Sequence, residues 1–173
     1  MKIPLLALLL AIAALTLNVS ADDEYPVSVA KLPADVTTSV QEYFPGSEIV
    51  SAMVDEDDDR RELNLRVEHK GLLLRVDARP NGRIREVDLD RGYRGLGALL
   101  GRESSLAPIS EEQLPSAVTE SLSGFFPGSD ILSAAEGVND DERFYRVRTR
   151  HKDLVLRVDI TRSGRILDID TVK

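Results

Sequence analysis

The chain of 173 residues contains no cysteine and no tryptophan, and it has only two histidines. Without cysteine there is no disulfide, no thiolate metal site, no cysteine nucleophile and no lipoprotein anchor. Aromatic residues make up only 5% of the chain, which argues against stacking platforms for bases or sugars. The formal net charge of -8 argues against nucleic acid as a partner, because an acidic surface repels a polyphosphate.

The N-terminus has the features of a targeting segment. Lys2 precedes the almost wholly apolar stretch Ile3–Leu17, and Val19-Ser20-Ala21 supplies the small residues that a signal peptidase needs. The alternative is a membrane anchor, but the apolar stretch of 15 residues is shorter than the ~20 that cross a hydrocarbon core. We therefore expect residues 1–21 to be a signal peptide. Residues 22–173 are expected to be periplasmic or secreted and not membrane-spanning.

The exported part contains a tandem duplication. Residues 32–90 align with residues 114–172 without a gap at a shift of 82 positions, with 27 identities in 59 pairs. A match of this length indicates duplication of one structural module. The sequence thus predicts a first repeat over 22–90, a Gly-rich linker over 91–110 and a second repeat over 111–173.

Each repeat is predicted to contain one helix followed by four strands. Val36 and Val40 recur at helical spacing, and Pro45-Gly46 ends the helix. Alternating apolar and polar residues then predict strands, with Asn81-Gly82 at the last hairpin turn. A unit of about 60 residues buries too little surface to be stable alone, so the two repeats are expected to dock. The predicted fold is α+β, with a helix plus a four-stranded antiparallel sheet in each repeat and a shared eight-stranded sheet.

The ends of the predicted helices and the final turns follow the same pattern in both repeats. This pattern is carried by Leu32-Pro33, Phe44-Pro45-Gly46, Asn81-Gly82-Arg83-Ile84, Leu114-Pro115, Phe126-Pro127-Gly128 and Ser163-Gly164-Arg165-Ile166. In an exported chain it resembles the PepSY-like periplasmic domains, which are similar in fold to the β-lactamase-inhibitor-protein architecture. The resemblance covers both repeats but not the linker. It implies binding or inhibition in the cell envelope, and it brings no catalytic residues.

Two acidic segments lie where the first hairpin of each repeat is expected to turn. Their spacing fails the EF-hand pattern, because Arg60 and Arg66 stand at its Gly and Glu positions. A solvated turn is the favoured interpretation. A weak calcium-type site is the alternative, and its ligands would be Asp55, Asp57, Asp59, Asp140 and Asp141.

The other titratable residues give no catalytic pattern. His69 and His151 each precede a lysine in a predicted turn and lack further ligands at metal spacing, so we expect each to make a local hydrogen bond. Asp77 and Asp159 each follow an arginine by two positions, which is expected to lower their pKa values and keep them ionised. We therefore expect no enzymatic activity and no cofactor.

The polar face of the predicted sheets is the candidate binding surface. Phe144 replaces Glu62 of the first repeat, and the alternation predicts it to be an exposed aromatic anchor among arginines. A solvated sheet face is the alternative interpretation. The predicted partner-binding residues are Phe144, Arg146, Arg148, Arg150, Arg157 and Asp159 in the second repeat and Arg66 and Arg75 in the first.

Together these features predict an exported, non-enzymatic binding or inhibitory module. Its expected partner is an unidentified protein of the cell envelope, recognised through the polar sheet face. The alternative function is that of a calcium-responsive periplasmic protein that uses its acidic hairpin turns.

Overall fold

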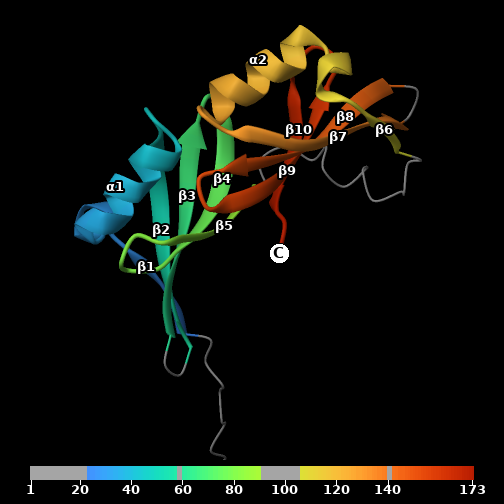
Figure 1. Ribbon diagram of the computed structural model, residues 1–173. Helices are drawn as coiled ribbons and strands as arrows, with labels where there is room; N and C mark the ends of the chain where they lie inside the picture. Colours follow the sequence, from blue (N-terminus) through green and yellow to red (C-terminus); the bar gives the residue numbers. More distant parts are fainter. Residues whose placement is uncertain (1–22, 58–59, 91–105, 140–141) are drawn as a thin grey trace, which may run out of the picture.

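The computed structural model describes residues 23–57, 60–90, 106–139 and 142–173, which form two α-helices and two five-stranded antiparallel sheets (Figure 1). The first repeat contains β1 (Asp23–Val27), η1 (Val29–Lys31), α1 (Ala34–Tyr43), β2 (Glu48–Asp57), β3 (Arg60–His69), β4 (Leu72–Ala78) and β5 (Ile84–Leu89). The second contains β6 (Ala107–Ile109), η3 (Glu111–Gln113), α2 (Ser116–Phe125), β7 (Asp130–Asn139), β8 (Glu142–His151), β9 (Leu154–Thr161) and β10 (Ile166–Thr171). The sheet orders are β1-β2-β3-β4-β5 and β10-β9-β8-β7-β6. The predicted α+β fold with two tandem repeats is confirmed.

Each sheet has one strand more than predicted. β1 pairs with β2, and β6 pairs with β7, so each helix is preceded by a strand that lies at the outer edge of its sheet. β6 lies within the segment 91–110 that the sequence predicts to be a linker, so the second sheet begins inside that segment. A three-residue edge strand that contains Pro108 leaves too weak a pattern to be predicted.

The two helices begin and end as their sequences predict. Both begin directly after a proline, Pro33 or Pro115, whose own backbone is extended. Val36 and Val40 of α1 are fully buried, because residues four positions apart lie on the same side of a helix. Each helix thus covers one face of its sheet.

The two sheets lie edge to edge, with β5 beside β10. The Thr171 hydroxyl accepts a hydrogen bond from the Val87 N–H at 2.7 Å and donates one to the Val87 carbonyl oxygen at 3.1 Å. The sheets nevertheless remain separate hydrogen-bonded units. The predicted shared sheet is therefore two five-stranded sheets joined through a side chain, not one eight-stranded ladder.

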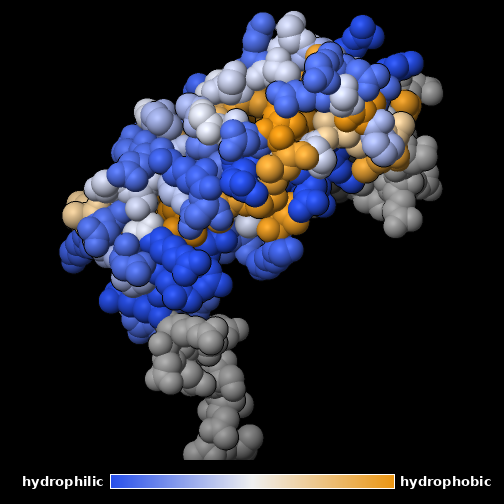
Figure 2. Space-filling view, in the orientation of Figure 1, coloured by the Kyte–Doolittle hydropathy of each residue, from blue (hydrophilic) through white to orange (hydrophobic). Residues whose placement is uncertain are grey.

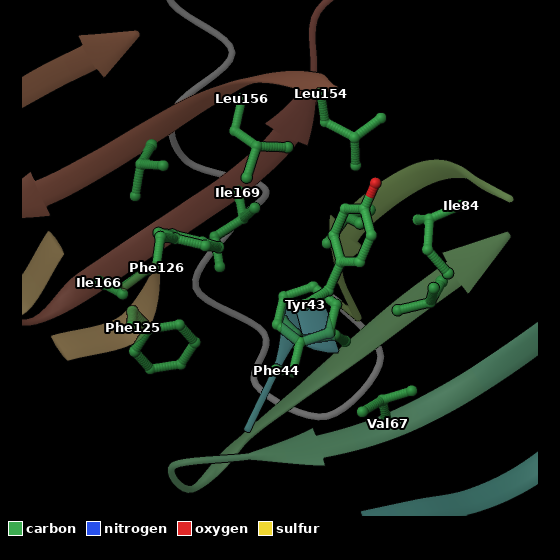
Figure 3. Close-up of a cluster of buried hydrophobic side chains, with 14 of the residues drawn as sticks. Tyr43, Phe44, Val67, Ile84, Phe125, Phe126, Leu154, Leu156, Ile166 and Ile169 are labelled. Carbon is green, nitrogen blue, oxygen red and sulfur yellow. The ribbon is translucent and has the colours of Figure 1, made fainter. Parts of the chain in front are cut away.

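A single hydrophobic core continues from one repeat into the other. The C-terminal ends of α1 and α2 both point toward the centre of the molecule (Figure 1). There Tyr43 and Phe44 lie near Phe125 and Phe126, with side chains of β9 and β10 beside them (Figure 3). Each repeat completes the core of the other, which a unit of about 60 residues needs for stability.

The two histidines lie in this shared core, and each is only 1% exposed. Nε2 of His69 is 3.3 Å from the carbonyl oxygen of Phe125, and Nε2 of His151 is 2.9 Å from that of Tyr43. The expectation of local hydrogen bonds is wrong, because each histidine bonds to the other repeat. The sequence shows that an imidazole flanks a turn, but it does not show which carbonyl the docking of the repeats brings to it.

The surface is predominantly hydrophilic over the first repeat, and hydrophobic side chains gather toward the centre and the second repeat (Figure 2).

No helix in the described part of the chain is long and apolar enough to cross a membrane. The predicted signal peptide, residues 1–21, lies outside the described residues.

Candidate functional site: the polar face of the two sheets

The side of each sheet that faces away from the helices carries the polar side chains. On β3, Leu63 and Leu65 are buried in the core, while Glu62, Asn64 and Arg66 alternate with them and point to the opposite side. We call this uncovered side of the two sheets the polar face. The eight predicted partner-binding residues lie on four of its strands, β3, β4, β8 and β9. The structure therefore brings them onto this face.

Arg146 and Asp159 form the most completely bonded ion pair of the polar face. Nε and Nη2 of Arg146 each donate a hydrogen bond of 2.8 Å to one oxygen of the Asp159 carboxylate. Asp159 is only 1% exposed, so the guanidinium neutralises a buried charge. This two-pronged geometry is the strongest form of a charge-assisted hydrogen bond in proteins. The pair holds β8 to β9 and is not free to engage a partner.

Three more of the predicted arginines are also held in ion pairs. Arg66 lies 3.1 Å from Asp90, and Arg75 lies 2.6 Å from Asp88. Arg157 pairs with Asp170, and its guanidinium is also 4.0 Å from Asp168. These arginines therefore contribute to the charge pattern of the face while their guanidinium groups are already occupied by carboxylates of the same molecule.

Arg148 and Arg150 differ from the other arginines of the face. Both are exposed on β8, and neither has a hydrogen bond or an ion pair with any described residue. On β9 the residues opposite Arg148 and Arg150 are Arg157 and Val155. On β7 they are Ser133 and Asp130, and Asp130 forms no ion pair with Arg150. These two guanidinium groups are thus available to an acidic partner.

Phe144 lies on the polar face, but it is not exposed. Its side chain is buried at 2% exposure. The ring lies so close to Gly137 of β7 that a Cβ on this glycine would come within 2.7 Å of it and within 2.8 Å of Leu106. The guanidinium of Arg146 covers the ring at 5.8 Å from its centroid. The prediction of an exposed aromatic anchor is therefore wrong, because the neighbouring strand carries a glycine on which the ring can lie.

The corresponding region of the first repeat is open. A hollow of about 660 Å³ lies over β1, β2, β3 and β4. Its charged and amide-bearing lining consists of Glu24, Asp55, Glu62, Asn64, Asp77, Arg66 and Arg75. The pairing of the strands places Glu24, Asp55 and Glu62 directly opposite one another in a row across β1, β2 and β3. Like charges in such a row destabilise a sheet, and the row is only partly compensated, by Arg85 at 3.8 Å from Glu62 and by the Asn64 amide at 3.3 Å from Glu24.

Asp77 has the most strongly shifted pKa among the residues that line the hollow. Burial raises the pKa of its carboxyl from 3.8 to about 6, and the carboxylates of Glu86, Asp88 and Glu62 act in the same direction. Its atom Oδ1 is buried and has no hydrogen-bond partner. The prediction that Arg75 keeps the pKa of Asp77 low is wrong, because desolvation outweighs the attraction of Arg75, which instead pairs with Asp88.

Four charged or amide-bearing residues of the hollow were not among the predicted site residues: Glu24, Glu62, Asn64 and Asp77. A position-by-position comparison of the two repeats contains a signal for them. Asn64 corresponds to Arg146 and Glu62 to Phe144 at the shift of 82, so the charge changes at both positions, which lie in the least similar part of the aligned repeats. Glu24 carries no such signal, because its strand lies before the aligned segment.

The acidic hairpin turns are described only in part. Asp55 lies in β2 and points into the hollow, while the side chain of Asp57 and all of Asp59, Asp140 and Asp141 lie outside the described residues. Among the residues that the structure describes, no group of three His, Asp or Glu side chains is close enough together to hold a metal ion. The calcium alternative for these turns stays a prediction.

Comparison with known proteins gives distant structural likenesses. No protein-family model matches the chain, and no curated protein matches it. It is similar to a solved protein from Bacteroides thetaiotaomicron that is named as a candidate calcium-regulated periplasmic protein. The identity is 16%, the match covers 86% of this chain and 98% of that one, and the TM-score is 0.35. It is also similar to a protein of the DUF2874 family from Bacteroides vulgatus that is named as a candidate periplasmic protein. The identity is 17%, the match covers 87% of this chain and 98% of that one, and the TM-score is 0.35. A BLIP-like protein from Bacteroides fragilis matches with 9% identity, 80% and 84% coverage and a TM-score of 0.34. Likenesses of this strength assign no function.

Proposed function

We propose that the chain is an exported, non-enzymatic binding module of the PepSY-like kind that recognises a protein of the cell envelope through its polar face. The observation that carries the proposal is the separation of charge between the two halves of this face. The second repeat presents the exposed guanidinium groups of Arg148 and Arg150, while the first presents a hollow lined by four carboxylates and two arginines that are already ion-paired. A partner with the complementary pattern would be attracted and oriented by both halves.

The arrangement of the titratable groups supports binding over catalysis. The two histidines are in the core, bonded to backbone carbonyls of the opposite repeat. Asp77 has a perturbed pKa, but its buried oxygen has no partner among the described residues that would make a general acid and base pair. We therefore assign the polar face to recognition, with the docked repeats as its support.

A capture experiment with charge-reversed variants tests the proposal. Residues 22–173 would be immobilised and exposed to the envelope fraction of the source cells. We expect a protein that is retained by the unmodified chain and lost by the double variant Arg148→Glu/Arg150→Glu. Phe144 is left unchanged, because it is buried and its replacement would disturb the fold.

The matched control is Lys31→Glu/Arg162→Glu. It changes the net charge by the same amount, and both residues are exposed outside the strands of the polar face. A partner lost by the polar-face variant and retained by the control supports the proposal. A folded chain that captures nothing, or equal capture by the polar-face variant, contradicts it.

A further inference from the structure

The second repeat shows how the equivalent of the hollow is filled. At the shift of 82, Leu106, Gly137 and Phe144 stand where Glu24, Asp55 and Glu62 stand in the first repeat. The ring of Phe144 occupies the space over Gly137 and Leu106. An apolar row in one repeat thus corresponds to a row of three carboxylates in the other.

The guanidinium of Arg146 is the second part of that filling. It lies over the Phe144 ring and donates two hydrogen bonds of 2.8 Å to the buried Asp159. The corresponding residues of the first repeat are Asn64 and Asp77, which lie directly opposite each other on β3 and β4. The Asn64 side chain is too short and uncharged to replace an arginine, and its amide donates to Glu24 at 3.3 Å instead.

Asp77 is therefore left without the cation that its counterpart has. Its Oδ1 has neither solvent contact nor a hydrogen-bond partner, whereas both oxygens of Asp159 accept a bond from Arg146. A buried acceptor without a partner costs free energy, which a ligand that supplies the donor recovers. The chain itself thus contains a filled version of this site, in which the group beside the aspartate is a guanidinium.

We propose that the hollow of the first repeat binds a guanidinium group, which an arginine side chain of the protein partner inserts beside Asp77 in the position that Arg146 occupies beside Asp159. The arginine as the source of this group rests on the proposed function, whereas the guanidinium site itself does not. Its planar fork matches one carboxylate with two hydrogen bonds, which an ammonium group does not.

The rest of the hollow fits a planar organic cation better than a metal ion. The carboxylates of Glu24, Asp55 and Glu62 follow one another across three strands, and the described residues hold no group of three such ligands that could enclose a metal. With Asp77, Arg66 and Arg75 they line a space of about 660 Å³ that admits a side chain. The two arginines pair with Asp90 and Asp88, so the four carboxylates of the lining would still attract a cationic side chain into this space.

The test is a titration of isotope-labelled residues 22–173 followed by NMR. The probe is Nα-acetyl-argininamide, a mimic of an arginine within a polypeptide, and agmatine is the free guanidinium compound that lacks a peptide backbone. Nα-acetyl-lysinamide and calcium chloride are the competing cations. We expect saturable shifts of the Asn64 side-chain amide and of β3 and β4 with the arginine probe, and weaker shifts with the lysine probe and calcium.

Two variants locate the binding. Asn64→Arg gives the first repeat the arginine of the second, so its own side chain should occupy the site and abolish binding. Asp77→Asn removes the acceptor charge and should weaken binding by about tenfold or more. The matched controls on the helix side are Thr38→Arg, which adds the same side chain, and Glu42→Gln, which removes one carboxylate, and both should bind as the unmodified chain does.

The inference is overturned if the folded chain gives no saturable response to either guanidinium compound. It is also overturned if Asn64→Arg and Asp77→Asn bind as well as the controls, or if the lysine probe or calcium binds as tightly as the arginine probe. Agmatine alone binding would overturn the arginine side chain as the source.

These outcomes are distinct from those of the capture experiment. A partner captured through Arg148 and Arg150 without any response to guanidinium compounds would contradict this inference and leave the proposed function intact. Guanidinium binding by a chain that captures no protein would contradict the proposed function and leave the site intact.

Discussion

His151 donates a hydrogen bond from Nε2 to the carbonyl oxygen of Tyr43, 2.9 Å away, although 108 positions separate the two residues. A carbonyl only accepts, so the proton is on Nε2. Tyr43 is the last residue of α1, where helix carbonyls lack a partner within the helix. His69 makes the equivalent contact with Phe125 at the end of α2. The two repeats thus cap each other's helices, and the duplication has produced a reciprocal contact.

The first prediction concerns this contact. His151→Ala should lower the free energy of unfolding by about 2–4 kcal/mol, because it leaves a cavity beside Tyr43 and Phe126 and a buried carbonyl without its donor. Urea unfolding followed by circular dichroism measures the change. His151→Gln, which retains an N–H donor, is the comparison and should lose less. Equal stability of the alanine variant and the unmodified chain would show that the contact does not hold the repeats together.

The second prediction concerns pH. Burial lowers the pKa of both histidines below 6.5, and the neighbouring Lys70 and Lys152 act in the same direction. The unfolded chain then binds protons more readily than the folded chain, so this stability is present above about pH 6.5 and is lost as the pH falls below it. The urea midpoint should therefore fall between about pH 7.5 and pH 5, and the fall should be smaller in His69→Gln/His151→Gln. An equal fall in both proteins would assign the acid sensitivity to other groups.

The sequence was sufficient to predict the helices, the turns and the alternation of the strands, because these depend on local patterns. It was not sufficient for features that depend on which strand lies opposite. The alternation puts Phe144 on the correct face but predicts it to be exposed, because the residue opposite it, Gly137, is known only from the register of β7 and β8. The pKa of Asp77 is raised and not lowered mainly because the fold desolvates its carboxyl, and Arg75 pairs across the sheet with Asp88.

The docking of the repeats was also beyond the sequence. The size of one repeat indicated that the two must pack together, but not that β5 would meet β10 through Thr171. The exchange of Arg146 for Asn64 is visible in the aligned repeats. The effect of this exchange depends on the buried, unpartnered Oδ1 of Asp77, which only the structure shows.

The third prediction concerns the Arg146 and Asp159 pair. Arg146→Ala should cost about 3–5 kcal/mol, because it leaves a charge on an aspartate that is only 1% exposed. The double variant Arg146→Ala/Asp159→Asn should recover part of this loss, since the buried charge is then removed. Arg148→Ala, at the exposed position next along the face, should change the stability by no more than about 0.5 kcal/mol. Equal losses of stability for the Arg146→Ala and Arg148→Ala variants in chemical denaturation would show that Arg146 does not neutralise a buried charge on Asp159.

The fourth prediction concerns Asp77, whose pKa is raised to about 6 by burial. The folded chain then holds this proton more tightly than the unfolded chain, so the contribution of Asp77 to stability falls as the pH rises from about 4 through 6, opposite to the contribution of the histidines. Asp77→Asn should therefore be more stable than the unmodified chain at about pH 7.5, and the gain should vanish near pH 3.8 and below. The groups that face Asp77 are Arg75, Glu86, Asp88 and Glu62, and all of them are retained in the variant. A gain that is independent of pH would mean that Asp77 is not the titrating group.

The last prediction concerns the turn between β4 and β5, which packs on the start of α1. Gly82 has a φ of 81°, and a Cβ there would lie 2.6 Å from the carbonyl oxygen of Asp35. Gly46 has a similar φ of 77°, but a Cβ there would meet nothing within 4 Å. Gly46→Ala should therefore cost only the backbone term of about 1 kcal/mol, whereas Gly82→Ala must also displace the helix and should cost at least about 2 kcal/mol. Thermal or urea unfolding of the two variants separates the backbone cost from the cost of the steric clash with α1. Equal losses of stability would show that a Cβ at position 82 does not clash with the helix.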